Sequence, residues 1–193
     1  MPEINIKLIA GLGNPGGEYE KTRHNVGFWF IDRLASQHNL TLKNDSKFLG
    51  EVAKLSFSSE NIWLIKPMTF MNRSGQSIAR LAQFYKIKPD QIIVVHDELD
   101  LSPGVVKLKK GGGHGGHNGL RDSIAQLGSK DFYRLRLGIG HPGSKEKVVG
   151  FVPGKTPESE KSLIESAIDK AMDSMDLILQ GDIQKAMNQL HAK

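Results

Sequence analysis

Cysteine is absent from the 193 residues of this sequence. Its absence excludes disulfide bonds, thiolate nucleophiles and thiolate metal ligands. Long apolar runs are absent as well, so no segment is a candidate transmembrane helix. The first residues, MPEINIKLIA, include an acidic side chain and enter a short β-like run, unlike a signal peptide. We therefore expect a cytoplasmic protein with no membrane partner.

The composition is that of an ordinary soluble globular protein, with 38% hydrophobic and 24% charged residues. Lysine and arginine together number 26 against 21 aspartates and glutamates, which gives a formal net charge of +5. This mild excess is compatible with a nucleic-acid or phosphate partner but does not require one. The length fits one domain over residues 1–193, with a core large enough to need no cross-links.

Strand-like and helix-like patterns alternate along the chain. The strand-like runs are INIKLIA, EVAKLSF, NIWLIK, QIIVVH, GVVKLK and YRLRLGIG, of which the second and third form a predicted hairpin. The spacing of apolar residues predicts four helical regions, namely 25–38, a helix capped by Ser74, a helix capped by Asn118, and a tail from Pro157 that breaks at Gly181. The expected fold is α/β, a single domain with a mixed, mostly parallel β-sheet flanked by helices and a C-terminal helical tail.

The stretch GLGNPG at residues 11–16 follows the first strand and satisfies the G-x-G-x-x-G pattern. A dinucleotide site needs a helix that begins within this pattern, so that its amides face a pyrophosphate. Here Pro15 disfavours a helical conformation at Asn14, and the helical pattern begins only near residue 25. The later stretch GGGHGGHNG lacks the G-K-[ST] ending of a P-loop. The nucleotide-binding alternative therefore rests on the pattern of glycines alone.

Potential metal ligands occur in two segments. The first follows QIIVV and contains His96, Asp97, Glu98 and Asp100, and the second is the glycine-rich stretch with His114 and His117. Such side chains are able to form a hydrolytic zinc or dimetal site. Against this, nothing in the glycine stretch fixes the geometry of its two histidines, and no H-E-x-x-H helix is present. A metallohydrolase stays an alternative, while our expectation is a site with no metal and no cofactor.

A histidine and a carboxylate are candidates for a catalytic site without a metal. His24 precedes the first predicted helix, and Asp97 follows a buried strand, where catalytic groups of α/β sheets usually lie. If they meet, Asp97 fixes the tautomer of His24 and raises the basicity of its other ring nitrogen. Because the chain has no cysteine and no G-x-S-x-G elbow, this base would activate water and not a protein nucleophile. The alternative is that both residues are structural.

Three asparagines, Asn14, Asn72 and Asn118, occupy loops that leave strands or enter helices. Taken singly, each has a structural interpretation as a turn or helix-cap residue. Taken together, they would line a cleft with neutral donors and acceptors. Such groups hold a carbonyl, orient a water or stabilise an oxyanion without adding charge.

Four blocks of the sequence resemble the signature blocks of bacterial peptidyl-tRNA hydrolases, namely GLGNPGGEYEKTRHNVGF, PMTFMNRSGQS, VHDELDLSPGVVKLKKGGGHGGHNGLRD and RLRLGIGHPG. They occur in the family's order, and the similarity continues through VVGFVPGK into the tail. The resemblance implies an enzyme that cleaves the ester between the C-terminus of a peptide and the 3′ end of tRNA. Such an enzyme recycles peptidyl-tRNA that ribosomes have dropped.

The resemblance also implies roles for individual residues. His24 would deprotonate the attacking water, Asp97 would hold His24, and Asn14 would distinguish N-blocked from free aminoacyl-tRNA. Substrate contacts are implied for Asn72 and Asn118, for Tyr19, Phe70 and Met71 along the cleft, and for Lys109 and Arg136 at the tRNA 5′-phosphate. From charge alone we add Lys107 and Arg134 as RNA contacts, and we place His114 and His117 in the cleft.

The glycines of residues 111–116 predict a compliant loop through which a large substrate approaches the backbone. Lys109 would lie at its entrance, and Asn118 at its exit would serve as both helix cap and substrate ligand. Residues 140–155 are rich enough in glycine and proline to close over a substrate. A non-catalytic RNA-binding protein is a further alternative. A monomer is the default expectation.

Overall fold

A seven-stranded mixed sheet forms the centre of the structure, a computed structural model that describes residues 5–192. Its strands are β1 (Leu8–Gly11), β2 (Lys43–Asp45), β3 (Gly50–Phe57), β4 (Glu60–Pro67), β5 (Ile92–Glu98), β6 (Val106–Lys110) and β7 (Tyr133–Gly138). They lie in the order β2-β3-β4-β1-β5-β7-β6. The four central strands β4, β1, β5 and β7 are parallel, whereas the pairs at both edges of the sheet are antiparallel.

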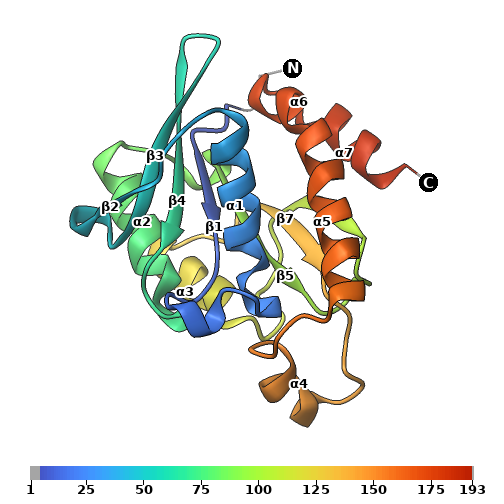
Figure 1. Ribbon diagram of the computed structural model, residues 1–193. Coiled ribbons are helices and arrows are strands. Elements are labelled where there is room, and N and C mark those ends of the chain that lie inside the picture. The colour runs from blue at the N-terminus through green and yellow to red at the C-terminus, as the bar shows by residue number, and fades with distance from the viewer. Residues whose placement is uncertain (1–4, 193) are drawn as a thin grey trace.

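Helices cover both faces of this sheet (Figure 1). They are α1 (Val26–Gln37), α2 (Ser74–Phe84), α3 (Asn118–Leu127), α4 (Lys145–Phe151), α5 (Glu158–Asp173), α6 (Met175–Leu179) and α7 (Ile183–His191). Helices α1, α5, α6 and α7 pack on one face and α2 and α3 on the other, while α4 stands apart from both layers (Figure 1). Among the helices of residues 5–192, none combines the length and apolar character that crossing a bilayer demands.

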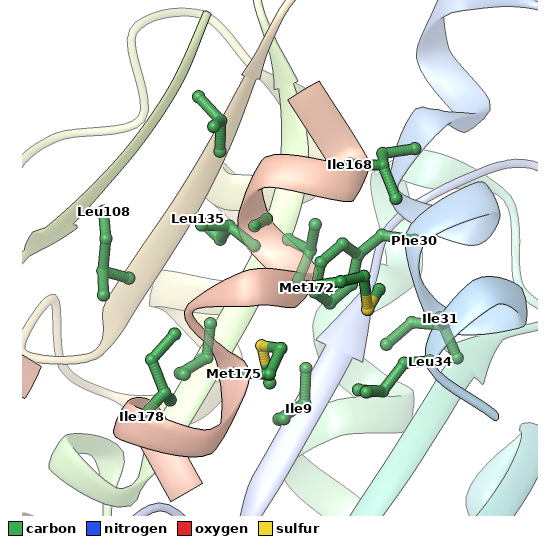
Figure 2. Close-up of a cluster of buried hydrophobic side chains, with 14 of the residues drawn as sticks. Ile9, Phe30, Ile31, Leu34, Leu108, Leu135, Ile168, Met172, Met175 and Ile178 are labelled. Atoms are coloured by element: carbon green, nitrogen blue, oxygen red, sulfur yellow. The ribbon is translucent and has the colours of Figure 1, made fainter. Parts of the chain in front are cut away.

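The apolar core has two parts, one on each face of the sheet, because successive residues of a strand point to opposite faces. On β1, Ile9 belongs to the part beneath α1 and α5, whereas Leu8 and Ala10 belong to the part beneath α2. Figure 2 shows side chains of the first part converging from α1, the sheet and α5, with Phe30 and Ile168 among them. Because both of its faces are covered, β5 begins with the uninterrupted apolar run IIVV.

The expected α/β class and mixed, mostly parallel sheet are confirmed, and the predicted hairpin is the antiparallel pair β3–β4. The first strand begins at Leu8, later than predicted, and Ile4 lies outside the described residues. The C-terminal stripe is divided at Ser174 between α5 and α6. Neither β2 nor α4 was predicted. No residue of either element is buried, so the sequence there carries no apolar pattern.

Both expected helix caps are wrong by one residue. Ser74 is the first residue of α2, and its hydroxyl donates to the carbonyl of Met71 at 2.8 Å. The amide of Gly75 donates instead to Oδ2 of Asp122 on α3, at 2.8 Å. Asn118 is likewise the first residue of α3, which is capped by the side chain before it. The bond from Gly75 to Asp122 joins the start of α2 to α3.

Candidate active site

A cleft of about 750 Å³ lies at the carboxyl ends of the central parallel strands. The loops after β1 and β4 contribute Asn14 and Met71 to its wall, and the end of β5 contributes Asp97. The glycine segment, the start of α3 and part of α4 complete it. Ligand sites of open α/β sheets form at this edge, because the loops that leave parallel strands meet there.

Close packing of α1 on β1 brings the start of this helix to the cleft. A Cβ added to Gly11 would lie 2.2 Å from the carbonyl oxygen of Gly27, and one added to Gly27 would lie 2.5 Å from the backbone nitrogen of Leu12. The short 3-10 helix Arg23–Asn25 precedes α1 and carries His24. The first glycine of GLGNPG therefore permits close packing of α1 on β1. A dinucleotide site needs a helix that begins directly after this strand, whereas β1 leads here into a loop.

His24 and Asp97 meet in this cleft. His24 Nδ1 lies 2.9 Å from each carboxylate oxygen of Asp97, and the two side chains are 12% and 2% exposed. Burial disfavours the imidazolium form, but the charge and the hydrogen bonds of Asp97 outweigh this and raise the pKa of His24. Burial also opposes ionisation of Asp97, yet His24 and His117 hold the pKa of its carboxyl well below the usual range. With a proton on Nδ1, His24 offers Nε2 as a base.

His117 is a second partner of Asp97. Its Nε2 lies 2.8 Å from Asp97 Oδ1, and its Nδ1 accepts the N–H groups of Gly119 at 3.1 Å and Leu120 at 3.3 Å. Because Nδ1 is an acceptor, the proton resides on Nε2 and the ring is neutral. His117 is thus the N-cap of α3, the role expected of Asn118. Both ring nitrogens form hydrogen bonds within the protein, and the ring lines the cleft, where the sequence analysis placed it.

The same hydrogen bonds bear on the metal alternative. His24, Asp97 and His117 place ligand-type atoms within 4.8 Å of one another. A metal ion on Nε2 of His117 would displace the proton there, and the neutral ring would then carry it on Nδ1. That nitrogen accepts the amides at the start of α3. Metal binding would therefore break the helix cap, and the geometry favours a hydrogen-bonded triad.

His96, which the sequence suggested only as a metal ligand, supports the strand end beside Asp97. It is 2% exposed, and its Nδ1 donates to the backbone carbonyl of Asp97 at 2.7 Å. Burial is the largest cause that lowers the pKa of His96 to about 3. His96 is therefore a neutral, buried hydrogen-bond donor.

Asn14 is held in one orientation by its neighbours. Its Oδ1 accepts the N–H of Met71 at 2.7 Å, and its backbone N–H and C=O pair with the side chain of Asn25 at 2.8 and 2.9 Å. The bond from Met71 distinguishes oxygen from nitrogen in the amide, which leaves Nδ2 as a donor. Asn72 and Asn118 line the same cleft, so the structure brings the three asparagines together.

Apolar side chains form the rim of the cleft. Phe70 is 59% and Val149 of α4 is 78% exposed, and both line it. The segment after α4 is tied to the site because the backbone N–H of His24 donates to the carbonyl of Val152 at 2.8 Å. Sequence reasoning expected residues 140–155 to close over a substrate but did not predict the helix α4, which forms part of this wall. Tyr19 does not line the cleft and lies in the short 3-10 helix Gly17–Tyr19.

Basic side chains from β6 and β7 occupy one part of the cleft. Lys109 and Arg136 line it, and Nη1 of Arg136 lies 3.7 Å from Oε1 of Glu98. Burial, followed by repulsion from Arg136 and Arg134, lowers the pKa of Lys109. Lys107 is exposed and outside the lining. Arg134, which was added as an RNA contact from charge alone, has a completely buried side chain.

Comparisons with known proteins point to one family. The profile of the peptidyl-tRNA hydrolase family matches residues 8–193. A peptidyl-tRNA hydrolase of Vibrio parahaemolyticus is 58% identical over 187 residues, which cover 96% of this chain and 95% of that protein. One from Acinetobacter baumannii is 55% identical over 97% of each chain. A crystal structure of the Acinetobacter baumannii peptidyl-tRNA hydrolase superposes with a TM-score of 0.95 at 53% identity, covering 100% of this chain and 97% of that one. The chain therefore belongs to the peptidyl-tRNA hydrolase family and is an enzyme of that class.

Proposed function

We propose that the enzyme hydrolyses the ester between the C-terminus of a peptide and the 3′ end of tRNA, using a water molecule activated by His24. The observation that carries this proposal is the link from Asp97 to Nδ1 of His24, at 2.9 Å, which leaves Nε2 as a base in the cleft. An ester at a ribose hydroxyl has a far better leaving group than an amide. A histidine-activated water therefore suffices without a metal or a covalent intermediate, and peptide bonds survive.

In the first step, His24 Nε2 takes a proton from water while the water oxygen attacks the ester carbonyl carbon. The negative charge that forms on the carbonyl oxygen is stabilised by neutral donors of the cleft. Collapse of this intermediate breaks the bond to the ribose oxygen, which receives the proton from His24. Asp97 remains a carboxylate throughout and stabilises the transient imidazolium. The products are a free peptide and a tRNA with a free 3′ end.

We assign the selection of N-blocked substrates to Asn14. Because Oδ1 already accepts the N–H of Met71, Asn14 offers the substrate only a donor. A donor suits the carbonyl of an N-acyl group, whereas the ammonium of an unblocked aminoacyl-tRNA is itself a donor. Asn72 and Asn118 would bind other backbone-like groups of the substrate, which suits an enzyme that accepts any peptide sequence.

The RNA contacts belong to the cationic part of the cleft. Lys109 and Arg136 would meet the 5′-phosphate of tRNA, and the affinity should fall as the salt concentration rises. Shape and phosphate contacts, rather than base edges, would recognise the RNA, because all elongator tRNAs must be accepted. Phe70 and Met71 would contact the substrate along the rim, with Tyr19 farther out. We propose that the enzyme acts as a monomer in the cytoplasm.

The test compares N-acetyl-aminoacyl-tRNA with the same tRNA carrying an unblocked amino acid, both in EDTA. We expect rapid release from the blocked substrate alone, its loss in His24→Asn, and its retention in the control His141→Asn outside the cleft. Activity that returns only with added metal would support a metallohydrolase. Binding of tRNA without cleavage would support an RNA-binding protein, and binding of NAD or ATP without cleavage would support a nucleotide-binding module.

A further inference from the structure

A buried arginine holds the glycine segment 111–116 in place. Arg134 is 0% exposed, and its guanidinium donates from Nη1 to the carbonyl of Gly113 at 2.5 Å and from Nη2 to the carbonyl of Gly112 at 2.6 Å. Nη2 also reaches the carbonyl of Lys130 at 3.3 Å, and the guanidinium carbon lies 4.5 Å from the ring centre of Phe132. Its planar fork therefore fixes two consecutive peptide units.

The orientation of these carbonyls determines where the next amides point. Residues 5–192 contain no cis peptide bond, so each N–H points opposite to the carbonyl of the same peptide unit. The N–H groups of Gly113 and His114 therefore point away from Arg134. Neither N–H donates to another group of residues 5–192, and both residues line the cleft. Gly112 has a φ of 104°, a conformation that favours glycine.

Positive charge around this segment exceeds the negative charge that balances it. Within residues 5–192, Arg134 and Lys109 form no ion pair with a carboxylate, and Arg136 has only the 3.7 Å contact with Glu98. Lys109 stands opposite Arg134 in the ladder of β6 and β7. The lowered pKa of Lys109 reflects burial and then repulsion from both arginines. An anion bound here would relieve that repulsion.

We propose that Arg134 is a positioning residue that presents the N–H groups of Gly113 and His114, beside Lys109 and Arg136, as a subsite for a phosphate monoester. Arg134 does not touch the phosphate; it fixes the amides and adds a buried positive charge. Consecutive amides of a glycine-rich turn are a known type of anion site. The proposal rests on the proposed function, in which this phosphate is the 5′-terminal phosphate of tRNA.

The amide of residue 114 is tested by comparing His114→Pro with His114→Ala. Both variants lack the imidazole, but only proline lacks the N–H, and His114 has no positive φ that would oppose proline. The substrates are N-acetyl-aminoacyl-tRNA with a 5′-phosphate and the same RNA with a 5′-hydroxyl. We expect His114→Pro to raise KM for the phosphorylated substrate about tenfold relative to His114→Ala, with no such difference for the hydroxyl substrate. Equal KM values for the two variants would overturn the role of this amide.

The positioning role is tested with Arg134→Lys, which keeps the charge but loses the fork. The control Arg80→Lys makes the same exchange at an exposed position outside the cleft. We expect only Arg134→Lys to lose most of the preference for the 5′-phosphate while kcat changes less than about twofold. Loss of kcat with an intact preference would instead mean that Arg134 supports the fold alone.

A binding measurement separates this proposal from the proposed function. Amide NMR signals of Gly113 and His114 should shift when the wild-type protein binds a 5′-phosphorylated acceptor-stem hairpin, and much less with the 5′-hydroxyl hairpin. In Arg134→Lys the phosphate-dependent shift should shrink. This result needs no catalysis, so an enzyme that fails to cleave the ester would refute only the proposed function. Identical shifts with both hairpins would refute the subsite.

Discussion

His117 donates from Nε2 to Oδ1 of Asp97 at 2.8 Å, while its Nδ1 accepts the N–H groups of Gly119 and Leu120 at the start of α3. One neutral side chain thus joins the end of β5 to the helix that begins with Asn118. The position of Asn118 relative to Asp97 therefore depends on a hydrogen-bonded link as well as on packing.

Replacement of His117 by phenylalanine keeps an aromatic ring but removes this link. We expect the lost cap to cost about 1 kcal/mol of the free energy of unfolding. The loss of a hydrogen bond to the buried carboxylate of Asp97 should lower kcat about tenfold. Urea denaturation and ester cleavage measure the two effects. His117→Asn supplies a cap but is too short to replace the imidazole, so it should recover stability without the rate. A wild-type kcat in both variants would show that the hydrogen bond from His117 to Asp97 does not support catalysis.

Asp97 sets the pH at which His24 acts as a base. Because Asp97 raises the pKa of His24, the acid limb of kcat/KM should have its midpoint above 6.5. Asp97→Asn removes the charge, so the limb should move to lower pH while the plateau falls about 100-fold. A pH profile of kcat/KM for both proteins checks this. An acid limb at the same pH in Asp97→Asn would show that another group titrates.

His96 should make the protein less stable in acid. It is neutral in the fold with a pKa of about 3, against the ordinary 6.5. Between these values the unfolded chain binds up to one proton more than the folded chain, so the free energy of unfolding decreases by about 1.4 kcal/mol for each unit by which the pH is lowered. His96→Phe should reduce that slope by one proton. Urea denaturation at several pH values measures it.

The interval for this measurement lies between the titrations of its neighbours. The lowered pKa of Asp97 contributes stability that is lost only as pH falls below the ordinary carboxyl value of 3.8. The raised pKa of His24 contributes stability that is present below 6.5 and lost as pH rises through its folded value. Between these two limits His191, whose pKa burial also lowers, adds to the slope in both proteins. The difference in slope between wild type and His96→Phe therefore reports on His96. Parallel slopes in wild type and His96→Phe would argue against a buried neutral imidazole.

Periodicity was sufficient to predict the fold class, because most strands and helices bury a face of apolar side chains. It failed for α4, which buries no residue and so has no pattern to detect. Arg134 and Leu135 are successive residues of β7 and point to opposite faces of the sheet, with Leu135 beneath the helices. Periodicity did not reveal that the glycine segment covers Arg134, because a loop that crosses a sheet leaves no periodic signal. The charge of Arg134 therefore suggested an RNA contact, although the side chain is buried.

The candidate site was likewise predicted only in part. Residue types and strand ends were enough to propose that His24 meets Asp97, and the two side chains lie in contact. The second histidine partner of Asp97 was not foreseen, because His117 is positioned by its bonds to the backbone of α3. Asn118 was named as the cap because asparagine has the higher intrinsic preference for that position. The tertiary bond from His117 to Asp97 shifted the start of the helix by one residue.

Asn14→Asp tests the selection of blocked substrates. The variant keeps an oxygen for the N–H of Met71 but replaces the donor Nδ2 with a charged acceptor. We expect kcat/KM for N-acetyl-aminoacyl-tRNA to fall about 100-fold, because the substrate carbonyl oxygen loses its donor and meets a negatively charged acceptor. The unblocked substrate should lose less, so the ratio of the two kcat/KM values falls toward one. The exposed Asn44→Asp on β2 adds the same charge elsewhere and should keep the wild-type ratio. An unchanged ratio in Asn14→Asp would place the selection on another residue.

Gly27→Ala tests whether the contact of α1 with β1 positions His24. The added Cβ would lie 2.5 Å from the backbone nitrogen of Leu12 and 2.6 Å from the carbonyl oxygen of Val95, and backbone atoms of a central sheet do not move aside cheaply. Alanine in a helix normally adds about 1 kcal/mol of stability. We expect this gain to be overridden by a net loss of about 3 kcal/mol from overpacking. The displaced helix should also lower kcat, because His24 would shift relative to Asp97.

The matched control is Gly17→Ala, where the added Cβ has no atom within 4 Å and φ is not positive. This variant should retain both stability and rate. Urea denaturation and single-turnover cleavage of N-acetyl-aminoacyl-tRNA separate the two effects of Gly27→Ala. If that variant matched the control in both, the helix contact would not place the base. The position of His24 would then have to depend on its backbone bond to the carbonyl of Val152, at 2.8 Å, and so on the segment that follows α4.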